Sequence, residues 1–144
     1  MALLEDLLMT AHSTTFPWPS HYRHFNYFEA QMKKHGKVAS LTAHGSGVYD
    51  LTRIQGDTLR IFICECYAFG VAEYMETIEN LGHVEVVIIN SAWCGYTPDA
   101  KLHCRESNVG LFKIGDFMGA LHSDDYWQYL TEVEKENFKK QGWL

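Results

Sequence analysis

Two acidic side chains and a tyrosine within residues 47–67 have a spacing that could hold a metal ion. Asp50 lies in the first half of this β-rich segment, and Glu65 and Tyr67 lie two residues apart at its end. Two carboxylates brought together repel each other unless a proton or a cation neutralises them, and divalent cations such as Mg²⁺ bind carboxylate oxygens. The pattern therefore indicates a divalent cation held by Asp50 and Glu65, with the phenol of Tyr67 beside it.

The turn between the two halves of this segment decides whether the acids meet. Gly56-Asp57 is typical of a two-residue loop between antiparallel strands, and such a loop pairs Gln55 with Thr58. Asp50 then lies opposite Ile63 and shares a face with it and with the acid and phenol that follow. Diagonal neighbours on one face have backbones about 7–8 Å apart, so both carboxylates could reach one ion. The alternative is two solvated acids at the open end of a hairpin.

A third acid, Glu29, lies on a helix predicted over residues 21–35, with Ser20 as its cap and Gly36 at its end. Tyr22, Phe25, Phe28 and Met32 form the apolar stripe of this helix. Glu29 is next to the stripe, so it could point toward the sheet edge and the acidic pair. The alternative is a solvated helix glutamate.

The remaining pattern predicts one α/β domain over residues 1–144, with a mixed central sheet flanked by helices. The continuous VVII run within residues 83–90 is typical of a strand buried on both faces. Thr97 and Pro98 are typical of a helix start. Further helices are expected over residues 2–10, 68–81, 97–107 and 124–140, and further strands over residues 37–43 and 109–114.

Composition and charge argue against several classes of protein. The net charge of −6 argues against a broad nucleic-acid-binding surface, although it leaves room for a local basic groove. The four cysteines form no CxxC pair, so a zinc knuckle is weakly supported. The chain shows no signal peptide and no apolar run long enough to cross a membrane, so we expect a cytoplasmic protein without a membrane partner.

From about Phe28 to Leu121 the chain resembles the restriction-endonuclease-like PD-(D/E)XK superfamily, and within it the Mrr-type catalytic domain. The glycine-rich stretch from Gly45 to Asp50 is similar to the stretch that leads to the family's first catalytic acid. Glu65-Cys66 falls on the second acidic position, and the segment VGLFKIGDFMGAL is similar to the family's closing strand and helix. The resemblance implies an αβββαβ core and Mg²⁺ or Mn²⁺ held by Asp50 and Glu65, with Glu29 as a helper. It also implies DNA as the substrate, and a homodimer.

Tyr67 stands where the family has its catalytic lysine. A phenol is neutral at pH 7, so it can orient a water molecule but supplies no positive charge beside a phosphodiester. No substitute is apparent, because Arg53 and Arg60 are predicted on the opposite face of the hairpin and Lys113 on a distant strand.

Three hypotheses remain open at this point. The first is a metal-dependent DNA endonuclease that uses Asp50, Glu65, Glu29 and Tyr67 as catalytic residues. The second is a catalytically inactive member of the nuclease fold that binds a nucleic acid or a protein partner. The third is a small-molecule or metal-binding protein that uses the cysteines and His103.

Overall fold

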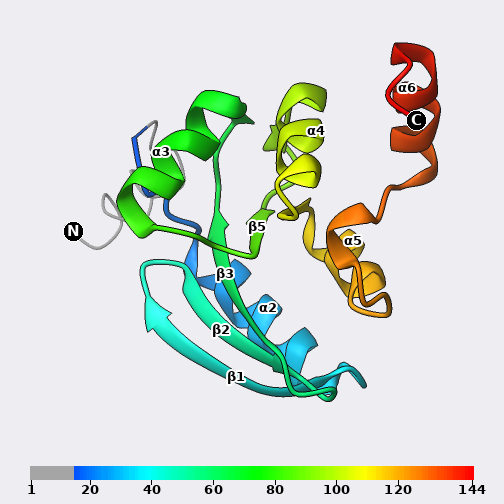
Figure 1. The fold of residues 1–144 in the computed structure, drawn as a ribbon. Coiled ribbons are helices and arrows are strands. Elements are labelled where there is room, and N and C mark those ends of the chain that lie inside the picture. The colour runs from blue at the N-terminus through cyan, green and yellow to red at the C-terminus, as the bar shows by residue number, and fades with distance from the viewer. Residues whose placement is uncertain (1–14) are drawn as a thin grey trace.

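The computed structural model describes residues 15–144, and its centre is a five-stranded sheet (Figure 1). The strand order is β1-β2-β3-β5-β7, where these strands span Val38–Gly45, Val48–Arg53, Thr58–Cys64, Val86–Ile89 and Gly110–Phe112. The first three strands are antiparallel neighbours, whereas β3, β5 and β7 run parallel. The predicted α/β class with a mixed sheet is therefore confirmed. The helix predicted over residues 2–10 lies outside the described residues.

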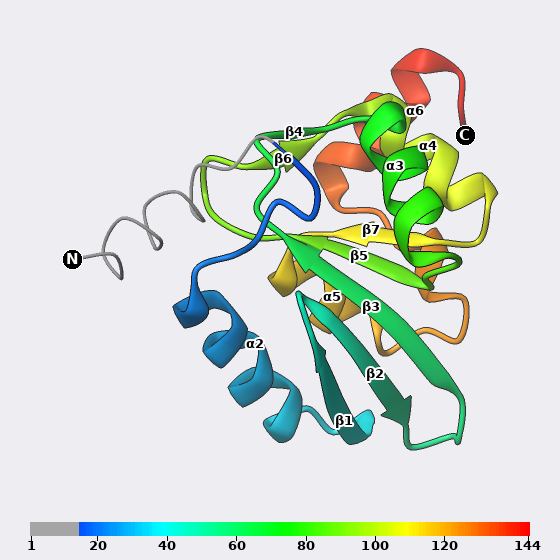
Figure 2. The same cartoon turned by 90° about the vertical axis from the view of Figure 1, so that its left-hand side faces the viewer.

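Helices cover both faces of the sheet and define two cores (Figure 2). On one face, α3 (Val71–Leu81) and α4 (Pro98–Glu106) pack over Phe62, Val87 and Leu111. On the other face, α2 (Tyr22–Lys34) and α5 (Ile114–Ala120) pack over Ile61, Ile63 and Ile88. All four residues of β5 are buried, as expected for a strand covered on both sides. Within the described residues, no helix is long and apolar enough to cross a membrane.

The predicted register of the β2–β3 hairpin is wrong by three residues. Thr58 pairs with Thr52, and Asp50 pairs with Arg60. The reason is the turn: residues 54–56 form a three-residue loop in which Gly56 takes the left-handed conformation with φ of 103°. Because the shift is an odd number of residues, it reverses the face on which each side chain of β3 lies relative to β2. Asp50 thus shares a face with Arg60 and Phe62, and not with Ile63.

Two predicted helices are shorter than expected. Residues 68–81 begin with a short strand, β4 (Ala68–Phe69), which pairs with β6 (Gly95–Tyr96) in a second sheet. Residues 124–140 divide into a 3-10 turn (Tyr126–Gln128) and α6 (Glu132–Gln141). The division follows from a capping box, because Thr131 Oγ1 accepts the Glu134 N–H at 3.1 Å while Glu134 Oε1 accepts the Thr131 N–H at 2.9 Å.

Gly47, just before β2, lies so close to the backbone of Ile63 that no side chain fits there. Its φ is 81°, and a Cβ atom there would lie 2.3 Å from the Ile63 carbonyl oxygen. We expect Gly47→Ala to lower the free energy of unfolding by about 2–4 kcal/mol, since both strain and overlap oppose it. The matched control is Gly45→Ala, because Gly45 has φ of 84° but nothing within 4 Å. In urea unfolding, Gly45→Ala should lower the free energy of unfolding by only about 1 kcal/mol. Equal losses in the two variants would contradict the role of the close backbone approach at Gly47.

Candidate functional site

Asp50 lies on the exposed part of the sheet and is engaged by basic side chains. The Arg60 guanidinium donates from Nε to Oδ1 at 3.0 Å and from Nη2 to Oδ2 at 3.1 Å. His44 Nε2 contacts Oδ2 at 2.8 Å. The bonds from Arg60, and then those from His44, hold the pKa of Asp50 below its usual range. Arg60 was predicted on the opposite face, and the register places it directly against Asp50.

Glu65 follows β3 on the other face of the sheet and is 4% exposed. Its Oε1 atom accepts the backbone N–H of His21 at 3.0 Å and contacts His24 Nδ1. His21 is also the N-cap of α2, in place of the predicted Ser20, and its Nδ1 accepts the Arg23 N–H at 3.2 Å. The buried carboxylate therefore ties the first turn of α2 to the end of β3. Sequence reasoning missed this role of His24, because the two partners lie 41 positions apart.

Glu65 and Asp50 thus do not form a pair. They lie on opposite faces of the sheet, and each is already bound by histidine or arginine side chains. Among the described residues, no group of three or more His, Cys, Asp or Glu side chains is arranged to hold a metal ion. The expectation that Asp50 and Glu65 share a face was wrong because the turn has three residues instead of two.

Glu29 has a structural partner as well. The Tyr49 hydroxyl donates to Glu29 Oε2 at 2.7 Å, and burial followed by this bond raises the pKa of Tyr49. Both residues border a cavity of about 190 Å³ at the start of the hairpin. The cavity is lined by Phe25, Glu29, Ala43, Gly45, Ser46, Gly47, Val48 and Tyr49. Neither Asp50 nor Glu65 lines this cavity, so Glu29 does not join them.

The carboxyl ends of β3 and β5 meet beside Glu65. Asn90, which follows β5, is 3% exposed; its Nδ2 donates to Ser20 Oγ at 3.3 Å, while its Oδ1 has no hydrogen-bond partner among residues 15–144. Lys113, at the end of β7, donates to the Ser91 carbonyl at 2.7 Å and to the Cys94 carbonyl. Burial lowers the pKa of Lys113. This lysine therefore lies at the same edge as Glu65, not on a distant part of the sheet, but its amine holds the loop after β5 in place.

Two aromatic side chains stand out from this edge. Tyr67 is 80% exposed and Trp93 is 69% exposed, and their loops are joined by the Gly95 N–H, which donates to the Tyr67 carbonyl at 3.2 Å. Tyr96, in the same region of the chain, is half-buried, and its hydroxyl donates to Glu134 at 2.6 Å. Because Tyr67 is so exposed, its phenol is directed to solvent and not to Asp50 or Glu65.

The cysteines and His103 form no ligand set in the described chain. All four thiols are free and buried. His103 packs its ring against Tyr74 with 5.4 Å between the ring centroids. The third hypothesis, a site built from these residues, therefore gains no support.

Lys101 is a buried charge that sequence reasoning missed. It is 1% exposed, its Nζ donates to the Leu111 carbonyl at 2.6 Å, and it lies 4.1 Å from the Phe112 ring centroid. Burial lowers the pKa of Lys101 to about 8, although Glu134, 3.9 Å away, acts in the opposite direction. The lysine borders a cavity of about 140 Å³ lined by Tyr96, Pro98, Lys101, Glu134, Asn137 and Phe138. The sequence signal for the burial of Lys101 was its position on α4 between Ala100 and Cys104, which are both buried.

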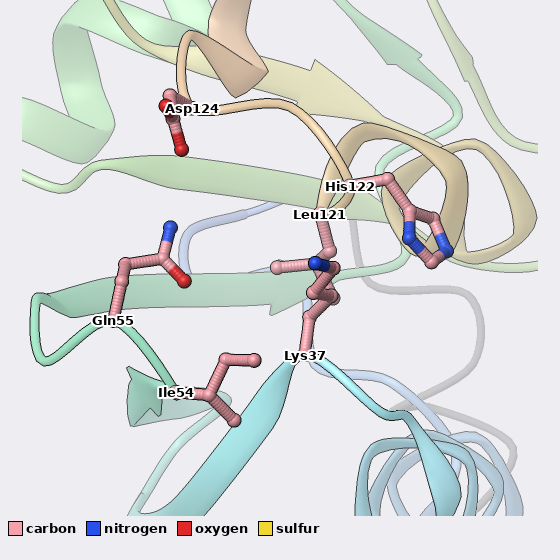
Figure 3. A pocket seen from close by; sticks show the side chains of 6 residues that line it. All are labelled: Lys37, Ile54, Gln55, Leu121, His122 and Asp124. Carbon is pink, nitrogen blue, oxygen red and sulfur yellow. The ribbon is translucent and has the colours of Figure 1, made fainter.

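A further cavity, of about 270 Å³, lies between the β2–β3 turn and the segment after α5 (Figure 3). It is lined by Lys37, Ile54, Gln55, Leu121, His122 and Asp124. Arg53 joins the two walls, since its Nη1 donates to the Ser123 carbonyl at 3.0 Å. None of the predicted site residues lines this cavity.

No protein-family model, curated protein or solved structure matches this chain.

Glu65 and Asp50 should differ sharply in their contribution to stability. We expect Glu65→Ala to lower the free energy of unfolding by about 2–3 kcal/mol, because it removes a buried carboxylate that accepts from two half-buried groups of α2. Asp50→Ala should cost no more than about 1 kcal/mol, because its ion pairs are exposed. Urea unfolding of both variants measures the difference. Similar losses would contradict the assignment of Glu65 as the anchor of α2.

Lys101 should make stability rise with pH in the weakly alkaline range. Its pKa is about 8 in the folded chain against 10.5 in the unfolded one, so between these values the unfolded chain binds more protons. Relative to Lys101→Met, the wild type should gain about 1 kcal/mol between about pH 7.5 and about pH 9. Measuring both proteins by urea unfolding cancels the shared titration of cysteines and tyrosines. If the difference in stability between the two proteins stays constant over this pH range, burial does not lower the pKa of Lys101.

Proposed function

We propose that this chain is a catalytically inactive domain of the restriction-endonuclease-like fold that acts by binding a partner. The observation that carries the proposal is the position of the two acids that the resemblance assigns to the metal. Asp50 and Glu65 lie on opposite faces of the sheet, and each is bound by basic side chains of this chain. In this arrangement the two carboxylates cannot both bind one metal ion.

The charges around Asp50 also argue against a metal ion there. Both of its oxygens accept hydrogen bonds from Arg60, so a cation would have to displace a positive charge that is already paired in bidentate geometry. Tyr67 adds no compensating chemistry, because it is exposed and remote from this pair. Metal activation of water, which the family reaction requires, therefore lacks both its ligands and its lysine.

The fold itself agrees with the resemblance. Apart from the short β4, the order α2-β1-β2-β3-α3-β5 follows the αβββαβ core that the resemblance implies. A domain that keeps this order without a metal site can still present loops and helix faces to a nucleic acid or a protein.

The test is a cleavage assay combined with a metal titration. Wild type, Asp50→Asn and Glu65→Gln should leave plasmid, linear duplex and single-stranded DNA intact in Mg²⁺ and in Mn²⁺, and calorimetry should show no saturable binding of either ion. Tyr67→Lys should also be inactive, because a lysine there does not bring the two acids together. Circular dichroism confirms that each variant is folded.

One pattern of results would reinstate the metal-dependent nuclease. Cleavage by the wild type that is lost in both Asp50→Asn and Glu65→Gln would show that the two acids act together in solution. Activity gained only in Tyr67→Lys would likewise overturn the proposal, since it would mean that the lysine alone was missing.

A further inference from the structure

Positive charge is concentrated in one part of this acidic chain. Residues 15–49 hold four Lys and Arg side chains against one acid, whereas residues 50–144 hold eight against fifteen. Three of the four cations, Arg23, Lys33 and Lys34, lie on α2 and are exposed. None of these three forms an ion pair with a carboxylate of the described chain.

The exposed residues of α2 form one continuous surface, here called the α2 outer face. At 100° per residue they fall within an arc of about 140°. The face consists of Tyr22, Arg23, Asn26, Tyr27, Ala30, Lys33 and Lys34. It contains no acid, because Glu29 lies beside the arc and accepts the Tyr49 hydroxyl. The opposite side of the helix is buried through Phe28 and Met32.

Aromatic rings lie between the cations on this face. Tyr22 and Tyr27 are each about half exposed. The Tyr22 ring packs on His21 with 4.4 Å between centroids and 33° between planes, so it is held in position while one side remains accessible. With 13 residues, the helix is about 20 Å long, which places Arg23 and the two lysines at opposite ends of the face.

We propose that the α2 outer face binds single-stranded nucleic acid. Arg23, Lys33 and Lys34 contact backbone phosphates, and Tyr22 and Tyr27 stack on unpaired bases, the combination used by sequence-tolerant single-strand binders. The acidic residues Glu73, Glu76 and Glu79 lie on α3, across the sheet from α2 (Figure 2), so they do not oppose the approach of a phosphate backbone. This inference rests on the proposed function and names the partner of the inactive domain.

An acidic protein would be the other partner of a basic helix face. Protein interfaces usually have an apolar centre, but the centre of this face is Asn26 and Ala30, without any large aliphatic side chain. A centre of small side chains, flanked by aromatic rings and cations, is better suited to binding bases and phosphates than to binding a protein.

The experiment is fluorescence anisotropy with a labelled twelve-nucleotide oligothymidylate, first at low salt and then across a salt series with EDTA present. We expect saturable binding by the wild type and a slope of log K against log salt of about −2, since three cations meet a single strand. The double variant Lys33→Glu/Lys34→Glu should weaken binding at least about tenfold. Tyr27→Ala should weaken it about fivefold or more through lost stacking.

The matched control is Lys139→Glu/Lys140→Glu. These lysines also lie exposed in the last turn of a helix, α6, so the change in net charge and local position is the same. The control should bind like the wild type.

Four outcomes would overturn the inference: no binding by the wild type, equal weakening by the control, unchanged affinity of Tyr27→Ala, or equal binding of a duplex of the same length. Competition by polyglutamate as strong as by oligothymidylate would also overturn it and favour an acidic protein partner. Because EDTA is present, these results are independent of metal-dependent cleavage, so the two proposals can fail separately.

Discussion

The turn from Arg53 to Asp57 decides on which face every side chain of the central hairpin lies. Gly56 closes it in a conformation that other residues rarely adopt, and the Arg53 guanidinium binds the Asp57 carboxylate through Nε and Nη2. Arg53 is itself buried and donates to the Ser123 carbonyl, so the turn is held against the segment after α5. A loop one residue shorter would have turned β3 over, placing Arg60 and Phe62 on the face that Ile61 and Ile63 occupy.

A second constraint comes from the buried carboxylate of Glu65. A polar group at this depth needs hydrogen-bond partners, and the start of α2 supplies two of them, the His21 N–H and His24 Nδ1. The same contacts set the orientation of α2, whose inner side then covers Ile61 and Ile63. An acid that the resemblance assigns to catalysis thus serves here to join a helix to the sheet.

The parts that could be predicted from sequence are those set by local patterns. The VVII run identified the buried parallel strand, and Thr97 with Pro98 identified the start of α4, where Thr97 Oγ1 accepts the Ala100 N–H at 3.1 Å. The hairpin register could not be predicted, because Gly-Asp is compatible with loops of two or three residues and a glycine with positive φ occurs in both kinds. The partners of Glu65 depend on contacts between distant segments, which periodicity does not encode.

The charge in the first turn of α2 is difficult to explain by the needs of the helix alone. Arg23 lies in the first turn, where the helix dipole disfavours a cation, and no acid occupies that turn. Lys33 has Glu29 one turn before it, but that carboxylate accepts the Tyr49 hydroxyl, and Lys34 has no acid three or four residues before it. By contrast, α6 places Glu132 and Glu134 in its first turn and Lys139 and Lys140 in its last, and Lys135 pairs with Glu132 at 3.2 Å. Lys33 and Lys34 lie in the last turn of α2, as the dipole favours and as in α6, so the departure from the rules of helix stability is confined to the first turn. There Arg23 departs from them in the direction that attracts an anion.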